Sequence, residues 1–287
     1  DTLILGHIGE LSRLTKSDYR STLLNNAIEK GKNIYCFDNP MPIINNPKYT
    51  NIYFPKIDST HIKKRFGKLY KTDKPILAVI GTNSRQGKFS LQLCLRKKLI
   101  EFGYSVGQIG TEPSALLFGF DEIFHCGYNG QVDLDISQTY IAVNDMIWNI
   151  TQKDVDLIIA GTQSGFLPYN DYNAMMFPTY HQIFFSALQP DAIIVCINPF
   201  DDIQFVNRTI KAAEGLSGGK VIGIVCFPID ISDSWQGNFG MKTRISEERE
   251  NEIKHKYRLH EDIKVYMLDK SDELEELLSE CIEYFQQ

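Results

Sequence analysis

Residues 77–94, with the sequence ILAVIGTNSRQGKFSLQL, contain a glycine directly after an apolar run and a Gly-Lys pair directly before a segment with helical spacing. This layout is typical of a loop that binds phosphate, because free backbone amides and the positive end of the following helix both attract an anion. Lys88 adds an ammonium group that can contact the terminal phosphates of a nucleotide. The alternative is a glycine-rich turn beside a surface lysine. The predicted phosphate-binding residues are Gly81, Thr82, Asn83, Ser84, Arg85, Gln86, Gly87, Lys88, Phe89 and Ser90.

Two features of this loop depart from the standard pattern G-x-x-x-x-G-K-[ST]. Gly81 precedes Gly87 by one residue too many, and Phe89 stands where a serine or threonine usually binds magnesium. Ser90 comes one residue later, which rotates its side chain by about 100° around a helix. Three possibilities follow: Ser90 reaches the metal through an altered backbone, Thr82 or Ser84 replaces it, or the site binds phosphate without magnesium.

The elements that must position this loop alternate regularly. Continuous apolar strands separated by helices indicate a parallel sheet that is covered on both faces, and such sheets bind ligands at the carboxyl ends of their strands. Strands are predicted at 76–80, 105–109, 155–160, 192–197, 221–226 and 263–268. Helices are predicted at 88–102, 135–152, 175–188, 201–215, 246–258 and 270–284.

The N-terminal part of the chain has a β-α-β pattern of its own. Strands are predicted at 2–6, 33–37 and 51–54 and a helix at 16–30, so residues 1–62 are expected to form part of a small α/β domain. Because the chain opens with Asp1 directly before an apolar run, we expect an N-terminal segment to be missing. Residues 63–74 carry six basic residues and one acidic residue, which favours a solvated linker over a patch that binds nucleic acid or phosphate.

The bulk composition excludes several classes of protein. With 287 residues, 43% hydrophobic residues, 23% charged residues and a net charge of −6, the chain is typical of a globular protein that does not bind nucleic acid. No apolar stretch approaches the roughly 20 residues needed to span a bilayer, so we expect no membrane partner. The six cysteines never form a CxxC pair, which favours a reducing, cytoplasmic setting. We also expect a homo-oligomer.

The loop GTNSRQGK at 81–88 resembles the G-T-D-x-x-x-G-K loop of dethiobiotin synthetase, a P-loop enzyme. It is more similar to the loop G-T-D-C-x-V-G-K-x-T of the domain-of-unknown-function family 1611, whose members include D-glutamate N-acetyltransferase-like proteins. Gly81, Thr82, Gly87, Lys88 and Ser90 match that pattern, and Asn83 stands where the family has Asp. The likeness covers most of residues 1–230 and is carried by the segments 1–37, 106–119, 154–169 and 189–199.

This resemblance implies an α/β fold with a Rossmann-like N-terminal domain, incomplete here, over 1–62 and a P-loop NTPase domain with a mostly parallel, doubly wound sheet over 75–287. It also exposes departures. Gly161 replaces the Glu of the family's E-G-Q segment, Gln163 keeps the glutamine, and Glu112 stands where the family has Gln. Glu112 is expected at the end of a strand neighbouring the loop, as a magnesium ligand or general base; the alternative is a solvated turn carboxylate.

The predicted function is that of an ATP-binding P-loop enzyme, which uses Mg²⁺ and acts on a small carboxylate or amino-acid-like substrate by phosphoryl transfer or activation. The amides of residues 82–88 would hold the phosphates. Lys88, Glu112 and Gln163 are the candidate catalytic residues, and Ser90 and Glu112 the candidate magnesium ligands. One alternative is a coenzyme A-dependent N-acyltransferase that binds acetyl-CoA with the same loop. Another is a non-catalytic nucleotide-binding subunit of a biosynthetic system.

Some polar residues outside the loop invite a functional interpretation. Asp201 and Asp202 follow the fourth predicted strand of the large sheet; we expect them to cap a helix, and the alternative is contact with a substrate amine or a ribose. His125 and Cys126 are adjacent, and adjacent side chains rarely face each other productively, so a structural pair is favoured over a nucleophile and its base. His181 is expected to be structural as well.

Overall fold

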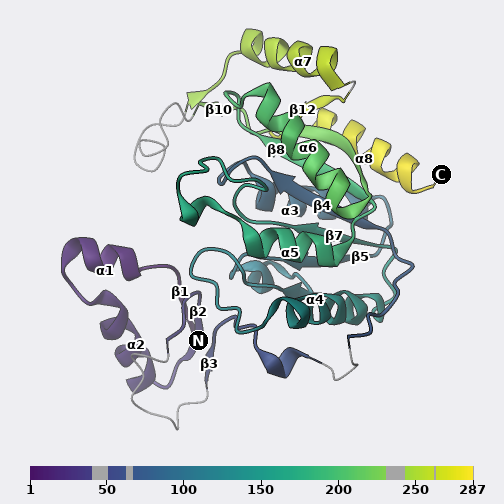
Figure 1. Cartoon of the computed structure of the whole chain (residues 1–287). Coiled ribbons are helices and arrows are strands. Elements are labelled where there is room, and N and C mark those ends of the chain that lie inside the picture. Colours follow the sequence, from purple (N-terminus) through teal and green to yellow (C-terminus); the bar gives the residue numbers. More distant parts are fainter. Residues whose placement is uncertain (41–50, 63–66, 231–242, 262, 287) are drawn as a thin grey trace.

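The computed structural model describes residues 1–40, 51–62, 67–230, 243–261 and 263–286 (Figure 1). These residues form a three-stranded sheet near the N-terminus, a seven-stranded sheet, and a short ribbon of β10 (Ile229–Asp230) and β11 (Thr243–Arg244). Both larger sheets are parallel, and the α/β fold class predicted from the alternation of strands and helices is confirmed.

The N-terminal sheet has the strand order β1 (Thr2–Leu5), β2 (Asn33–Cys36) and β3 (Ile52–Tyr53). Helices α1 (Gly9–Thr15) and α2 (Tyr19–Glu29) connect the first two strands. The prediction had one helix over 16–30 and missed α1. Lys16 adopts a left-handed conformation with φ 52°, which ends α1, and the Asp18 carboxylate then accepts the Ser21 amide at 2.9 Å to start α2.

The larger sheet consists of β4 (Ile76–Gly81), β5 (Val106–Gly110), β6 (Glu122–Ile123), β7 (Leu157–Gly161), β8 (Ala192–Ile197), β9 (Lys220–Cys226) and β12 (Val265–Met267). The strand order is β12-β9-β8-β4-β7-β5-β6, so β4, which precedes the phosphate loop, lies in the middle of the sheet. All six residues of β4 are buried, as the continuous apolar run predicts for a central parallel strand.

Helices cover both faces of this sheet (Figure 1). Leu77 and Val79 of β4 pack in one apolar cluster, with leucines of α3 and α8, while Ala78 and Ile80 pack in another on the opposite face, with α5, α6 and α7. This division follows from the alternation of side chains along a strand. The helices are α3 (Lys88–Glu101), α4 (Ile136–Thr151), α5 (Thr179–Leu188), α6 (Ile203–Ser217), α7 (Glu247–Glu261) and α8 (Ser271–Phe285).

The described part of the segment predicted as a solvated linker, 67–74, is largely exposed, and one of its residues contacts α4 closely. The Tyr70 ring stacks on Trp148 of α4 with 4.5 Å between ring centroids. The Asn144 side chain accepts the Tyr70 amide at 2.7 Å and donates to the Tyr70 carbonyl at 3.0 Å. These contacts hold Tyr70 on α4, whereas its neighbours Leu69 and Lys71 are exposed. Residues 63–66 lie outside the described residues, and the boundaries at 62 and 75 remain predictions.

Residues at the carboxyl ends of the N-terminal strands contact the larger sheet's half of the chain. The Asn129 side chain donates to Asp38, which follows β2, at 3.0 Å, and the Tyr35 hydroxyl of β2 donates to the Pro113 carbonyl at 2.7 Å. The ligand edge of the larger sheet is therefore partly covered by the N-terminal unit. Within the described part of the chain, no helix has the length and apolar character that crossing a membrane requires.

Candidate functional site

The predicted phosphate loop leaves the carboxyl end of β4 and turns directly into α3, which begins at Lys88. Arg85 and Gly87 adopt left-handed backbone conformations with φ 61° and 72°. At Gly81, an added Cβ would lie 2.5 Å from Gln86 Oε1 and 3.1 Å from Lys88 Cδ. A side chain at position 81 would therefore force the Gln86 side chain to move.

Part of the loop's backbone is already engaged. The Thr82 amide donates to the Cys196 carbonyl at 3.1 Å, the Asn83 amide to Gln86 Oε1 at 2.9 Å, and the Ser84 amide to Asn83 Oδ1 at 2.8 Å. The expectation that all amides of residues 82–88 face an anion is therefore wrong for these three. Among the described residues, no acceptor contacts the amides of residues 85–89, which leaves a consecutive set at the N-terminus of α3.

A buried hydrogen-bond network gives the long loop its shape. Asp201 accepts the Thr82 hydroxyl, the Gln86 amide at 3.2 Å and the Asn198 backbone amide at 2.8 Å, and Gln86 also donates to Thr82. Burial raises the pKa of Asp201, and the hydrogen bonds from Thr82, Asn198 and Gln86 oppose that rise. Asp202 accepts the Gln204 amide at 2.6 Å and caps α6. The helix-cap prediction thus holds for Asp202, whereas Asp201 positions the loop.

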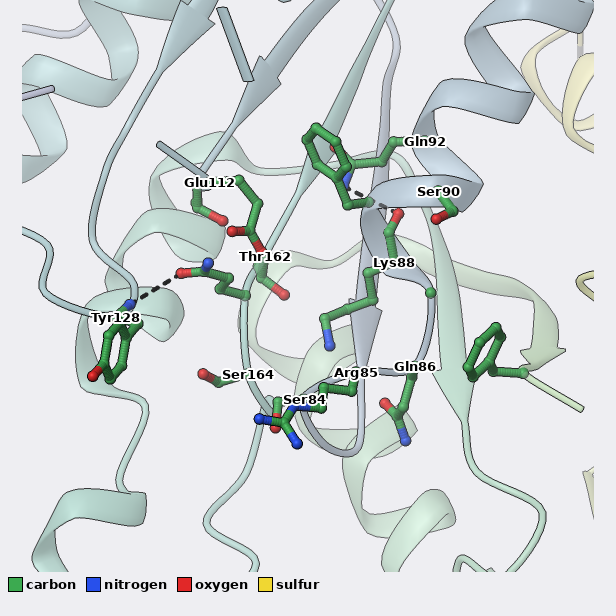
Figure 2. A pocket seen from close by; sticks show the side chains of 15 residues that line it. Ser84, Arg85, Gln86, Lys88, Ser90, Gln92, Glu112, Tyr128, Thr162 and Ser164 are labelled. Carbon is green, nitrogen blue, oxygen red and sulfur yellow. Dashed lines mark hydrogen bonds between the residues drawn. The ribbon is translucent and has the colours of Figure 1, made fainter. Parts of the chain in front are cut away.

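Lys88 is buried, with 6% of its surface exposed, and its Nζ donates to the Asn83 carbonyl at 2.6 Å. Figure 2 shows its ammonium pointing into the space that the loop encloses. Burial lowers the pKa of Lys88 to about 8, and the nearby Cys196, Glu112 and Asp201 oppose this. A buried ammonium with one neutral hydrogen-bond partner favours the binding of an anion beside it.

A cavity of about 550 Å³ lies in front of the loop and collects most of the predicted site residues (Figure 2). Residues 84–90 form one wall, so Lys88 and Ser90 both reach it. Glu112, Gln163 and Tyr128 line the side toward the N-terminal unit, and Phe227 lines another part. Gly81, Thr82 and Asn83 do not line the cavity, and their role is to shape the loop behind it.

Glu112 lies farther along the sheet than expected, because β7 separates β5 from β4. Glu112 was predicted at the end of a strand neighbouring the loop; its strand β5 is not adjacent to β4, and Glu112 lines the same cavity as Lys88. Burial raises the pKa of Glu112; a hydrogen bond from Gln163 and the nearby Lys88 and His7 oppose the rise. The Gln163 side chain is itself oriented by the Tyr128 amide, which donates to its Oε1 at 3.2 Å.

The residues at the loop can accommodate magnesium in the way nucleotide sites usually do, through one or two protein oxygens with phosphates and waters. Ser90 is exposed and lines the cavity, as Glu112 does. The Phe89 ring instead stacks on Phe120 at 5.3 Å between centroids, so Phe89 can offer the site only its backbone amide. The described residues contain no group of three or more His, Cys, Asp or Glu side chains that could hold a metal by themselves.

Several residues of the site were not identified from the sequence. Gln92 and Thr162 line the cavity, and within the described part of the chain their Oε1 and Oγ1 atoms are buried without a hydrogen-bond partner. The sequence signal was indirect: Gln92 lies four residues after Lys88 on a helix, and Thr162 directly follows Gly161.

Cys126 contacts a histidine other than its neighbour His125. The Cys126 Sγ lies 3.5 Å from His181 Nδ1. Burial lowers the pKa of His181 to about 4 and raises the pKa of Cys126, so both groups are neutral and the thiol is a poor nucleophile. These pKa shifts favour a structural role for Cys126 and His181.

The parallel sheet, the central strand that ends in the loop, and the helix that begins at the lysine define a P-loop NTPase-like domain. Residues 63–226 match the DUF1611 P-loop domain, described as a domain of unknown function. The match spans more than half of the chain, and the chain belongs to this family. The resemblance seen in the loop and its neighbouring segments is thereby confirmed.

The solved structures similar to this chain include a DUF1611 family protein from Anabaena variabilis, with a TM-score of 0.60 and 14% identity over 89% of this chain and 74% of that one. A nucleotide-binding protein from Archaeoglobus fulgidus in complex with ADP has a TM-score of 0.41 and 17% identity, over 73% and 88%. Cobyrinic acid a,c-diamide synthase from Mycobacterium smegmatis, with bound ADP and magnesium, has a TM-score of 0.44 and 11% identity, over 75% and 96%. No curated protein matches the sequence.

Proposed function

We propose that this protein is an ATP-binding P-loop enzyme that transfers a phosphoryl group to, or activates, a small carboxylate or amino-acid-like substrate. The observation that carries the proposal is that the buried Lys88 ammonium and the amides of residues 85–89, for which the described residues provide no acceptor, lie on one cavity. A polyphosphate would supply acceptors for all of these donors at once. The six free cysteines fit a reducing compartment, and we propose a cytoplasmic location.

The two sides of the cavity would bind different parts of the reactants. The phosphates would be held by the amides of residues 85–89, by Lys88 and by the exposed Arg85. Magnesium would be held by Ser90 and Glu112, and a bound magnesium ion would neutralise part of the phosphate charge. The acceptor would bind toward Glu112, Gln163 and Tyr128. During transfer the acceptor oxygen forms a bond to the γ-phosphorus while the bond to the β-phosphate oxygen breaks and ADP leaves. Such a reaction depends mainly on positioning and charge neutralisation, so few catalytic side chains are needed.

A second candidate is a nucleotide-binding subunit without turnover. Position 161 carries no carboxylate, and the Cβ of any residue there would collide with Gln92 at 2.0 Å. This candidate requires ATP binding without ATP hydrolysis in the presence of any small acceptor. Release of phosphate or ADP by the wild-type protein, absent in Lys88→Met, would contradict it.

The proposal is tested by thermal denaturation of the wild type and Lys88→Ala with ATP, GTP or acetyl-CoA, each with and without magnesium. A ligand at about 100 times its Kd should stabilise the protein by roughly 2.7 kcal/mol. We expect ATP to stabilise the wild type and not the variant. If acetyl-CoA stabilises the wild type without magnesium while ATP stabilises neither protein, the acyltransferase alternative replaces the phosphoryl-transfer proposal.

Glu112→Gln is expected to lower the affinity of the ATP-bound protein for Mg²⁺ by at least about tenfold, because the carboxylate charge is lost beside the cation. The pKa of Glu112 is raised, so in the wild type Mg²⁺ affinity should fall as the pH decreases through that raised value and the carboxyl is protonated. Titration of Mg²⁺ into the ATP-bound protein measures both effects. Glu101→Gln, at the exposed end of α3, is the matched control. An unchanged Mg²⁺ affinity in Glu112→Gln would show that Glu112 is not a magnesium ligand.

A further inference from the structure

Gln92 occupies the space beside Gly161. A Cβ added to Gly161 would lie 2.0 Å from Gln92 Nε2 and 2.4 Å from Gln92 Oε1. The Gln92 side chain is almost fully buried, with 3% of the residue's surface exposed. The region into which a side chain at position 161 would project is therefore filled by an amide that comes from α3, one helical turn after Lys88.

The orientation of this amide follows from its hydrogen bond. Gln92 Nε2 donates to the Lys88 carbonyl at 3.2 Å, a contact drawn in Figure 2. Because a carbonyl oxygen can only accept, the nitrogen must face Lys88, and Oε1 must face the other way. Gln92 Oε1 and Thr162 Oγ1 are both buried and have no hydrogen-bond partner among the residues that the structure describes, and both residues line the nucleotide cavity. An amide oxygen without a donor and a hydroxyl without a partner, on two residues that line one cavity, indicate hydrogen-bonding groups that arrive with a ligand.

The donors that fit are waters on a divalent cation. A magnesium ion on a nucleotide keeps several waters, and each offers protons to acceptors around it. In P-loop sites a carboxylate usually accepts from such a water, and Gly161 provides none here. A bare phosphate oxygen would not satisfy Gln92 Oε1, because both atoms are acceptors.

We propose that Gln92, together with Thr162, accepts hydrogen bonds from the waters of a nucleotide-bound divalent cation and so positions that cation without a negative charge. Gln92 is thus a positioning residue, which acts on the cation through water. This inference rests on the proposed nucleotide binding. If this inference is right, magnesium strengthens nucleotide binding partly because neutral oxygens of Gln92 and Thr162 hold its waters. A carboxylate introduced at position 92 should then strengthen magnesium binding further.

The test compares ATP affinity without Mg²⁺ and Mg²⁺ affinity of the ATP-bound protein, both by calorimetric titration. Gln92→Met keeps an unbranched side chain of similar length against Gly161 and removes both polar atoms. We expect its Mg²⁺ affinity to fall by about 10- to 100-fold, as when an outer-shell partner of a metal site is lost, with the magnesium-free ATP affinity unchanged. Gln92→Glu should raise Mg²⁺ affinity. Thr162→Val is nearly isosteric and should also lower the Mg²⁺ affinity without changing the magnesium-free ATP affinity. This variant replaces Gln92→Met in the test if Gln92→Met does not fold.

Gln108→Met is the matched control, because Gln108 is a buried glutamine on β5 whose Nε2 also lacks a partner but does not line the cavity. Equal losses of ATP affinity with and without Mg²⁺ in Gln92→Met would show that Gln92 only supports the loop and would overturn the inference. An unchanged Mg²⁺ affinity in Gln92→Met would show that Gln92 only packs against Gly161, and it would also overturn the inference. A wild-type protein that binds ATP equally with and without Mg²⁺ would overturn this inference and the proposed magnesium ligands but leave nucleotide binding in place. A wild-type protein that binds no ATP would overturn the proposed function as well.

Discussion

Lys88→Met is expected to abolish nucleotide binding and, at neutral pH, to stabilise the ligand-free protein. Burial lowers the pKa of Lys88 to about 8 from its ordinary value of 10.5, so holding the charged ammonium in the folded protein costs up to about 3 kcal/mol. Methionine fills similar space without that charge. The lost hydrogen bond to the Asn83 carbonyl offsets part of the gain.

The pH dependence gives this prediction a sign that can be checked. Between pH 8 and 10.5 the unfolded chain keeps the Lys88 proton while the folded chain releases it, so wild-type stability should rise with pH in that interval. The advantage of Lys88→Met should therefore be full below pH 8 and vanish by about pH 10.5. Denaturant unfolding of both proteins at pH 7 and pH 10.5 measures the difference. A variant less stable than the wild type at pH 7 would mean that the ammonium is well solvated.

Nucleotide binding should respond to the same ionisation. The phosphates need the charged ammonium, so the ATP affinity of the wild type should fall by about tenfold for each rise of one pH unit above pH 8. For the same reason, ATP binding near pH 9 should be accompanied by the uptake of a proton by Lys88. Calorimetry in two buffers of different ionisation enthalpy detects that proton. Lys97→Met, which removes an exposed lysine from the same helix, is the control and should bind ATP like the wild type. ATP binding by Lys88→Met with wild-type affinity would remove the central support for the proposed function.

Asp201→Ala should cause the second large effect, a loss of about 3 kcal/mol in stability together with most of the ATP affinity. The substitution leaves the Thr82 hydroxyl, the Gln86 amide and the Asn198 backbone amide without their shared acceptor in a buried place. Gln86 also holds the Asn83 amide, so the loop that presents residues 85–89 should lose its shape. Chemical denaturation and ATP titration measure the two losses.

The adjacent aspartate provides the control for this prediction. Asp202→Ala removes the cap of α6 and should cost about 1 kcal/mol without changing ATP affinity. Asp201→Asn keeps one acceptor oxygen in the same place and should recover part of the lost affinity. If Asp201→Ala binds ATP within about twofold of the wild type, the loop is held by its backbone alone and the network has no role in binding.

Much of the fold was predictable because it depends on local pattern. Six apolar runs separated by helical spacing predicted a parallel sheet, which the structure confirms, and the position of the loop strand in the middle of that sheet came from the structure. Local pattern was less informative for short elements that depend on single residues. The left-handed Lys16 and the cap at Asp18 divide the first predicted helix, and the Tyr70–Trp148 stack fixes one aromatic residue of an otherwise largely exposed segment on α4.

For the site, the sequence determined which residues form the loop, since glycines, a lysine and a helix start are adjacent in the chain and act through the backbone between them. Only the tertiary structure decided which amides remain free, that Asp201 rather than Asp202 holds the loop, and that Gln92 fills the space beside Gly161. Thr82 and Asp201 are 119 residues apart, and their contact arises because β4 and β8 are neighbours in the sheet. Pairings of this kind depend on strand order, which local spacing does not encode.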